Sequence, residues 1–199
     1  LREQEMLTTL IDLGRQVAGV LDVTELLPQI PRLIARLIQF DAFAVYLLDE
    51  RRGDLRVAYS VGYPESGGPM RLKIGQGLVG NAVQSQMPLL VNDVNVDARY
   101  VSLVPGMASE VVAPLLHKKQ PIGALNILSR NKDQFTPADV ELLRQFAAHV
   151  AVSIANARLF ERVRSDAEAF ETLAEIGRDV ASVLDLDELF SRIGKVMRR

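Results

Sequence analysis

The sequence predicts an α+β fold, in which helices pack against an antiparallel sheet. Apolar residues first recur at helical spacing, then in short runs separated by turns, and finally along one long helical segment. A shorter helical segment is inserted among the short runs. This order of elements favours the α+β class.

Composition and charge fit one globular domain with short additions, or two very small domains. The chain has 199 residues, of which 48% are apolar and 24% charged, a balance typical of folded proteins. Its net charge of −2 gives no broad attraction to nucleic acid or to an anionic membrane. No apolar stretch is long enough to span a bilayer. We therefore expect that the protein neither binds nucleic acid nor inserts into a membrane.

The chain contains no cysteine and only two histidines, His117 and His149. Disulfides, thiolate metal sites, cysteine nucleophiles and thioether attachment of a chromophore are therefore excluded for these residues. Two scattered imidazoles also leave little for a metal cluster. We predict no cofactor: no covalent bilin, no haem and no structural metal.

The N-terminal part predicts two helices. Residues 4–20 carry an apolar stripe at helical spacing. A second helix, capped by Asp22 or Thr24, is expected to continue to Ile38. Pro28 is tolerated in its first turn, whereas Pro31 is expected to kink it.

The middle of the chain predicts strands and one inserted helix. Apolar or alternating runs predict the strands, and a glycine-containing turn at 75–77 opens the helix. The strands are expected at 42–48, 55–61, 70–74, 88–91, 110–116 and 122–129, and the helix at 78–86.

A long helix is predicted to follow. Thr136 is its expected cap, and residues 138–176 contain neither Gly nor Pro. At 1.5 Å per residue that stretch alone is about 58 Å long. Apolar residues form a coiled-coil seam, from which we predict a homodimer through the flanking helices. The seam comprises Val152, Leu159, Val163, Phe170, Leu173, Val180 and Leu184, with weak points at Asn156, Asp166 and Gly177.

An internal repeat indicates a piece of a longer, tandem protein. The segment Leu10–Leu26 recurs as Leu173–Leu189, 163 residues later, with most residues matching in register. We accordingly predict an N-terminal linker or dimerisation helix at 1–22, a sensory domain at 23–160, and a connector with the start of a second repeat at 161–199.

Five short motifs, taken in order, resemble the GAF domain family. They are Ile74-Gly-Gln-Gly-Leu-Val-Gly-Asn-Ala-Val83, Pro88-Leu-Leu-Val-Asn-Asp93, Val111-Val-Ala-Pro-Leu115, Ile122-Gly-Ala-Leu-Asn126 and Phe135-Thr-Pro-Ala-Asp-Val-Glu-Leu-Leu143. The resemblance implies a six-stranded antiparallel sheet with the N- and C-terminal helices on one face and a ligand pocket on the other.

The first group of candidate ligand-binding residues is Gly77, Leu78 and Val79. Backbone N–H groups at a helix start, with the positive helix end behind them, suit an anionic group. In nucleotide-binding GAF domains this helix start receives the cyclic phosphate, so a cyclic nucleotide is one candidate ligand. The alternative is that the glycines only form a tight turn.

The other candidates are polar residues of the expected pocket. Asn126 is a lone amide in an apolar strand and needs a partner; either a ligand or a structural contact would satisfy it. By resemblance, Tyr100 and Ser109 bracket a loop that closes over the pocket, and Tyr59 lies near a strand end. Packing is the alternative role for both tyrosines.

The resemblance implies a small-molecule-sensing regulatory domain of a multidomain, bacterial, cytoplasmic signalling protein. It would relay its ligand state through the flanking helices to an effector such as a serine phosphatase, histidine kinase or diguanylate cyclase. The alternative is a ligand-free dimerisation and spacer module. We do not expect an enzyme, because the GAF-type methionine sulfoxide reductases need cysteines and this chain has none.

Overall fold

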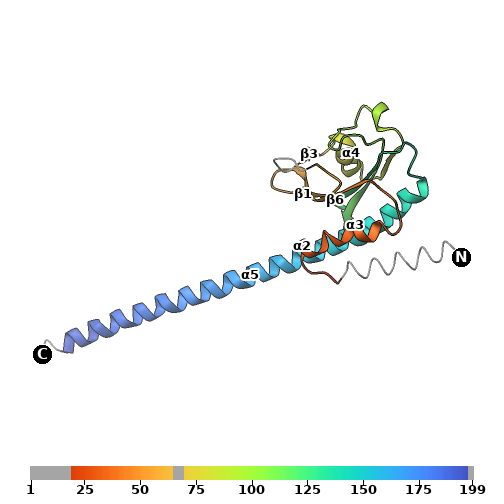
Figure 1. The fold of residues 1–199 in the computed structure, drawn as a ribbon. Coiled ribbons are helices and arrows are strands. Elements are labelled where there is room, and N and C mark those ends of the chain that lie inside the picture. Colours follow the sequence, from red (N-terminus) through yellow and green to blue (C-terminus); the bar gives the residue numbers. More distant parts are fainter. Residues whose placement is uncertain (1–18, 65–69, 197–199) are drawn as a thin grey trace. The chain divides into compact units, whose positions relative to one another are not determined.

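The computed structural model describes residues 19–64 and 70–196 (Figure 1). The helix predicted over residues 4–20 lies almost wholly outside the described residues. The chain forms two compact units, one ending at Arg158 and one beginning at Leu159.

A six-stranded antiparallel sheet forms the centre of the first unit, which confirms the predicted fold class. Its spatial order is β3-β2-β1-β6-β5-β4, so the two central strands are β1 and β6. The strands are β1 (Ala42–Asp49), β2 (Asp54–Val61), β3 (Arg71–Lys73), β4 (Leu89–Val91), β5 (Ser109–His117) and β6 (Gln120–Ser129).

Helices α2 (Val23–Leu26), α3 (Gln29–Ile34) and the start of α5 (Pro137–Val196) cover one face of the sheet. Side chains such as Phe146 and Ile154 are fully buried there, and their removal from water is the main stabilising contribution on this face. The single helix expected up to Ile38 was wrong. Two short helices replace it, because a proline without a backbone N–H occupies the cap of α3.

The other face carries α4 (Gly77–Ser85) and the long connection between β4 and β5 (Figure 1). A short 3₁₀ turn, η1 (Val94–Val96), begins this connection. Buried side chains from α4 pack on those of β1 and β6 that point to this face. The sheet therefore separates the apolar core beneath α5 from the one beneath α4, and a smaller cluster of Ala42, Val104, Met107 and Leu128 lies apart from both.

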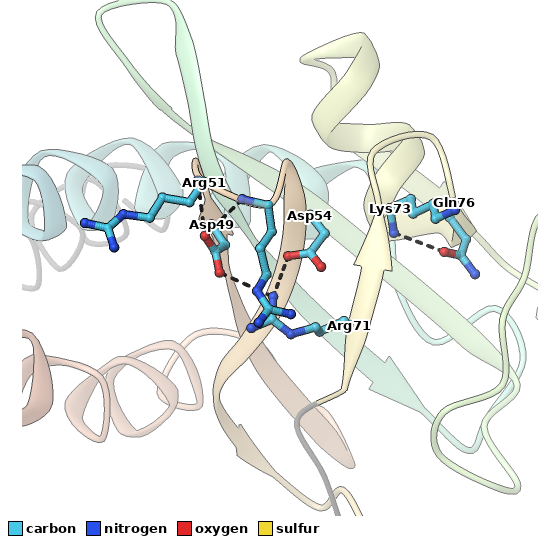
Figure 2. Close-up of polar contacts among 7 residues, drawn as sticks. Asp49, Arg51, Asp54, Arg71, Lys73 and Gln76 are labelled. Atoms are coloured by element: carbon cyan, nitrogen blue, oxygen red, sulfur yellow. Dashed lines mark hydrogen bonds and ion pairs between the residues drawn. The ribbon is translucent and has the colours of Figure 1, made fainter.

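An ion-pair cluster fixes the edge strand that leads into α4. Arg71 Nη1 lies 2.5 Å from Asp54 Oδ1 and 3.4 Å from Asp49 Oδ2 (Figure 2). Next along the chain, the backbone N–H of Lys73 donates to Gln76 Oε1 at 3.0 Å. These contacts join three strands and hold the turn from which α4 begins.

Helix α5 starts where the sequence predicts and extends past residue 176. The N–H and hydroxyl of Thr136 both donate to Asp139 Oδ2, at 2.8 and 2.7 Å, and the Asp139 N–H donates back to Thr136 Oγ1. This reciprocal cap satisfies N–H groups at the helix start. The described part of the helix reaches Val196, with Gly177 inside it.

Candidate functional site

A closed cavity lies between the sheet, the start of α4 and the loop that follows Tyr100. The space open to the centre of a water molecule is about 10 Å³, which is room for about one water. Apolar side chains form most of the wall, and four polar ones interrupt it. The lining residues are Tyr46, Tyr63, Leu72, Gly77, Leu78, Val79, Val101, Leu103, Val104, Glu110, Asn126 and Leu128.

The polar side chains of the cavity leave hydrogen-bonding capacity unused. Asn126 Nδ2 donates to the Tyr63 hydroxyl oxygen at 3.1 Å. Among the described residues, the buried Asn126 Oδ1 and Tyr46 hydroxyl have no hydrogen-bond partner. Tyr46 is fully buried, and Glu110 and Asn126 are only 4% and 3% exposed. Buried polar atoms without partners are uncommon in folded proteins, so these mark a candidate binding site.

The strand register gathers these side chains on one face. Asn126 lies opposite Ala44 of β1 and Val112 of β5, while Tyr46 lies opposite Ala124. Side chains on a strand alternate between faces, so these positions all point toward α4. Small alanine side chains lie beside both residues, Ala44 next to Asn126 and Ala124 next to Tyr46.

Burial dominates the electrostatics of Glu110. Removal from water raises the pKa of Glu110 to about 8; the neighbouring Asn126 amide opposes this shift and the Asp97 carboxylate adds to it. Among the described residues, Glu110 forms no ion pair with Lys, Arg or His. Burial likewise raises the pKa of both Tyr46 and Tyr63.

The start of α4 closes the opposite side of the cavity. Gly77 adopts a left-handed φ of +68°, which a residue with a side chain rarely adopts. A Cβ at Gly80 would lie 2.5 Å from the carbonyl oxygen of Lys73, so only glycine lets the helix approach its turn so closely. The Gln76 side chain makes no capping hydrogen bond at this helix start.

Four of the seven predicted site residues line the cavity: Gly77, Leu78, Val79 and Asn126. Tyr100 lies beside it, half-buried, with its hydroxyl unpartnered among the described residues. Ser109 does not line the cavity, because its hydroxyl donates to the Asn131 carbonyl oxygen at 2.7 Å. The binding roles themselves remain predictions.

Tyr59 lies on the other face of the sheet, which corrects its expected placement. A bulge shifts the register, so that Tyr46 pairs with Val57 but Val45 pairs with Tyr59. The extra residue reverses the alternation, and Tyr59 packs against the core beneath the helices. Its side chain is therefore separated from the cavity by the sheet.

Sequence reasoning missed Tyr46, Tyr63 and Glu110. The sequence could have indicated Glu110, because a carboxylate lies near the start of a mostly apolar strand, two residues before Val112 and therefore on the same face. Tyr46 similarly interrupts an apolar run. Tyr63 follows β2 in a loop, where no periodicity predicts in which direction a side chain points.

A larger and more open groove lies between the end of α3 and the end of β6. It includes Asp41, whose carboxylate accepts hydrogen bonds from Ser129 and from the backbone N–H of Arg130. No buried side-chain atom of its lining lacks a partner among the described residues. The small closed cavity is therefore the better candidate site.

The fold defines an α+β domain with a small cavity between its sheet and α4, and comparison with known proteins names its family. The sequence model of the family described as "GAF domain" matches residues 20–155. The chain belongs to the GAF domain family.

Two curated relatives are similar in sequence. The formate hydrogenlyase transcriptional activator of Salmonella typhimurium is 23% identical over 209 residues, covering 100% of this chain and 29% of the relative. The free methionine-R-sulfoxide reductase of Escherichia coli is 35% identical over 81 residues, covering 41% of this chain and 49% of the relative. This chain thus spans less than half the length of either protein.

Solved structures share the fold. The free methionine-R-sulfoxide reductase of Neisseria meningitidis, in complex with its substrate, superposes with a TM-score of 0.69 at 23% identity, covering 76% of this chain and 89% of that one. The GAF domain of a phosphoenolpyruvate-protein phosphotransferase from Coxiella burnetii gives 0.69 at 21% identity, covering 77% and 95%. An enzyme and a domain of a larger protein therefore share this architecture.

The described residues contain neither a membrane-spanning helix nor a cluster of metal-binding side chains. No helix in this part of the chain is both long and apolar enough to cross a membrane. Within the same ranges, no group of three or more His, Asp or Glu side chains is arranged to hold a metal ion.

Proposed function

We propose that this domain senses a small molecule, which binds in the closed cavity beneath α4. The observation that carries the proposal is the pair of buried, unpartnered atoms in the cavity wall, Asn126 Oδ1 and the Tyr46 hydroxyl. Leaving such groups without a partner costs about 1–3 kcal/mol each. A ligand with complementary polar groups would recover this cost.

Binding requires the loop that closes the cavity to move outward. Val101, Leu103 and Val104 form that part of the wall. Backbone hydrogen bonds anchor the two ends of the loop, at Tyr100 and Ala108, and residues 101–107 belong to no strand or helix. Displacing this segment therefore breaks side-chain packing and leaves the sheet hydrogen bonds intact, a change typical of ligand-binding loops.

The sheet offers a direct route from the cavity to α5 within the first unit. Asn126 and Leu128 line the cavity, while their strand neighbours Leu125 and Ile127 pack in the core that contains the start of α5. A ligand that shifts β6 would therefore also act on the helix packed against its other side. We propose this as the start of a helical relay to an effector.

The wider setting of the protein is also a proposal. The Salmonella relative is a transcriptional activator, and this chain covers 29% of it. We propose a regulatory domain of a multidomain, bacterial, cytoplasmic signalling protein, dimeric through the seam of α5. We propose no methionine sulfoxide reductase activity of the cysteine-dependent kind, because the chain offers no cysteine thiol.

One observation supports the alternative, a ligand-free dimerisation and spacer module. In this structure the cavity admits only about one water. A domain that never opens this loop would need no ligand.

Native mass spectrometry of the purified chain decides between the two functions. After incubation with the small-molecule fraction of a bacterial cell extract, the wild-type protein should retain a bound compound. Asn126→Leu fills the cavity and should abolish retention, whereas Asn92→Leu, a matched change at an exposed site, should preserve it. No retention by the wild-type protein would support the spacer, whereas equal retention by both variants would contradict binding in the cavity.

A further inference from the structure

Glu110 sits in the cavity wall without a positive charge to balance it. It extends from the start of β5, opposite Val91 on one side and Leu128 on the other. The groups that act on its charge are the Asn126 amide and the Asp97 carboxylate, and Glu110 in turn acts on Tyr46, Tyr63 and Tyr100. None of these groups is a cation.

The cavity wall offers a ligand two kinds of hydrogen-bond acceptor, the Asn126 carbonyl oxygen and the Glu110 carboxylate. The Asn126 amide already donates to Tyr63, which leaves its carbonyl oxygen free to accept. An ionised Glu110 only accepts. The three tyrosine hydroxyls can donate, but they can also accept. A ligand with N–H groups would therefore satisfy both of these acceptors.

Charge narrows the ligand class further. An anionic ligand would meet the Glu110 carboxylate, and Asp97 lies close enough to act on the same site. A cationic ligand would supply the missing counter-charge of a carboxylate that is otherwise costly to ionise in this apolar setting. Resting on the proposed function, we infer that the ligand presents a positively charged N–H donor, such as a primary ammonium, to Glu110 and Asn126 Oδ1.

This pairing couples binding to proton release. Burial raises the pKa of Glu110 to about 8, so near neutral pH the empty cavity holds mostly the protonated acid. An ammonium group binds the carboxylate and must displace that proton, so its affinity rises with pH up to about 8. The pKa of Asp97 is lowered to about 2 by Arg99, and those of the three tyrosines are raised. Glu110 is therefore the group of this cluster that titrates in the window.

Methyl NMR of the full chain tests the inference with three probes of similar size: propylammonium, neutral 1-propanol and propionate, at equal ionic strength. Propylammonium should shift the methyl signals of Leu78, Val79 and Leu128, with an affinity that rises up to tenfold per unit between about pH 6 and 8. The affinity of 1-propanol should not change with pH. Glu110→Gln should weaken propylammonium binding at least tenfold near pH 8, while Glu141→Gln, a matched change at an exposed site on α5, should not.

The pH series on the unmodified protein applies even if Glu110→Gln fails to fold. Tighter binding of 1-propanol or propionate than of propylammonium would refute the ligand class and leave the proposed sensing function standing. Absence of any shift at these methyl groups with all three probes would also refute the ligand class. The extract experiment then decides the sensing function separately.

Discussion

A single buried carboxylate gives the cavity its chemical character. Glu110 lies among apolar side chains and next to the amide of Asn126. Its raised pKa means that the folded protein keeps a proton that the unfolded chain releases above its ordinary value of 4.5. The protein therefore holds more protons than its unfolded state between about pH 4.5 and 8.

Stability should accordingly fall as pH rises through this window. The slope from Glu110 alone is at most about 1.4 kcal/mol per pH unit. Glu110→Gln should remove this slope and become more stable than the wild-type protein near pH 8, by an amount on the order of a few kcal/mol. Urea unfolding at a series of pH values measures this difference.

Glu141→Gln provides the control for that measurement. Arg144 lowers the pKa of Glu141 to about 2, so this exposed carboxylate stays charged throughout the window. The control should retain the wild-type slope. If Glu110→Gln and the wild-type protein show the same pH dependence, Glu110 is already ionised in the folded cavity.

At the scale of the elements, local sequence patterns predicted the strands, α4 and the start of α5. These follow from periodicity and caps, which neighbouring residues determine. Local patterns could not predict on which face of the sheet Tyr59 lies, because that depends on a bulge in the pairing of β1 with β2. The grouping of Glu110, Asn126 and Tyr46 likewise depends on strand register, which joins residues far apart in the chain.

The position of α4 makes a prediction about Gly80. A Cβ there would meet the Lys73 carbonyl oxygen at 2.5 Å and the backbone of Gly75 at 3.0 Å. Neither is a flexible side chain, so Gly80→Ala must shift α4 away from its turn. We expect a loss of about 1–3 kcal/mol in the free energy of unfolding, measured by chemical denaturation.

Gly177→Ala is the matched control in α5. A Cβ at this helical position meets nothing within 4 Å in the described part of the chain. Alanine favours the helix over glycine by about 1 kcal/mol, so this variant should gain helix content by circular dichroism. A stable Gly80→Ala with unchanged cavity signals would show that α4 tolerates the added methyl group.

At the scale of the whole molecule, the second unit displays an apolar seam on α5. Leu159, Val163, Phe170, Leu173 and Val180 are 53–73% exposed, and Leu184 lies among residues whose side chains the structure does not describe. Their spacing alternates between three and four residues with breaks, as in a two-stranded coiled coil. The sequence alone predicted this seam, because its pattern is local.

Asp166 occupies one of the breaks in the seam and is exposed. Since a charged residue at a seam position weakens helix pairing, Asp166→Leu should strengthen the dimer. We expect at least a tenfold lower dissociation constant by analytical ultracentrifugation. Arg162→Leu, next to the seam but outside its repeat, serves as the control. A wild-type chain that stays monomeric, with no dimer gained by Asp166→Leu, would contradict pairing through this seam.

The central claim joins cavity binding to α5, and hydrogen exchange of the full chain tests it most directly. The measurement compares the protein with and without the small-molecule fraction of a bacterial extract, for the wild type and for Asn126→Leu. We predict slower exchange in α4, in residues 101–107 and in the buried part of α5 at 142–154 for the wild type alone. Unchanged exchange in all three segments, or equal protection in Asn126→Leu, would contradict the claim.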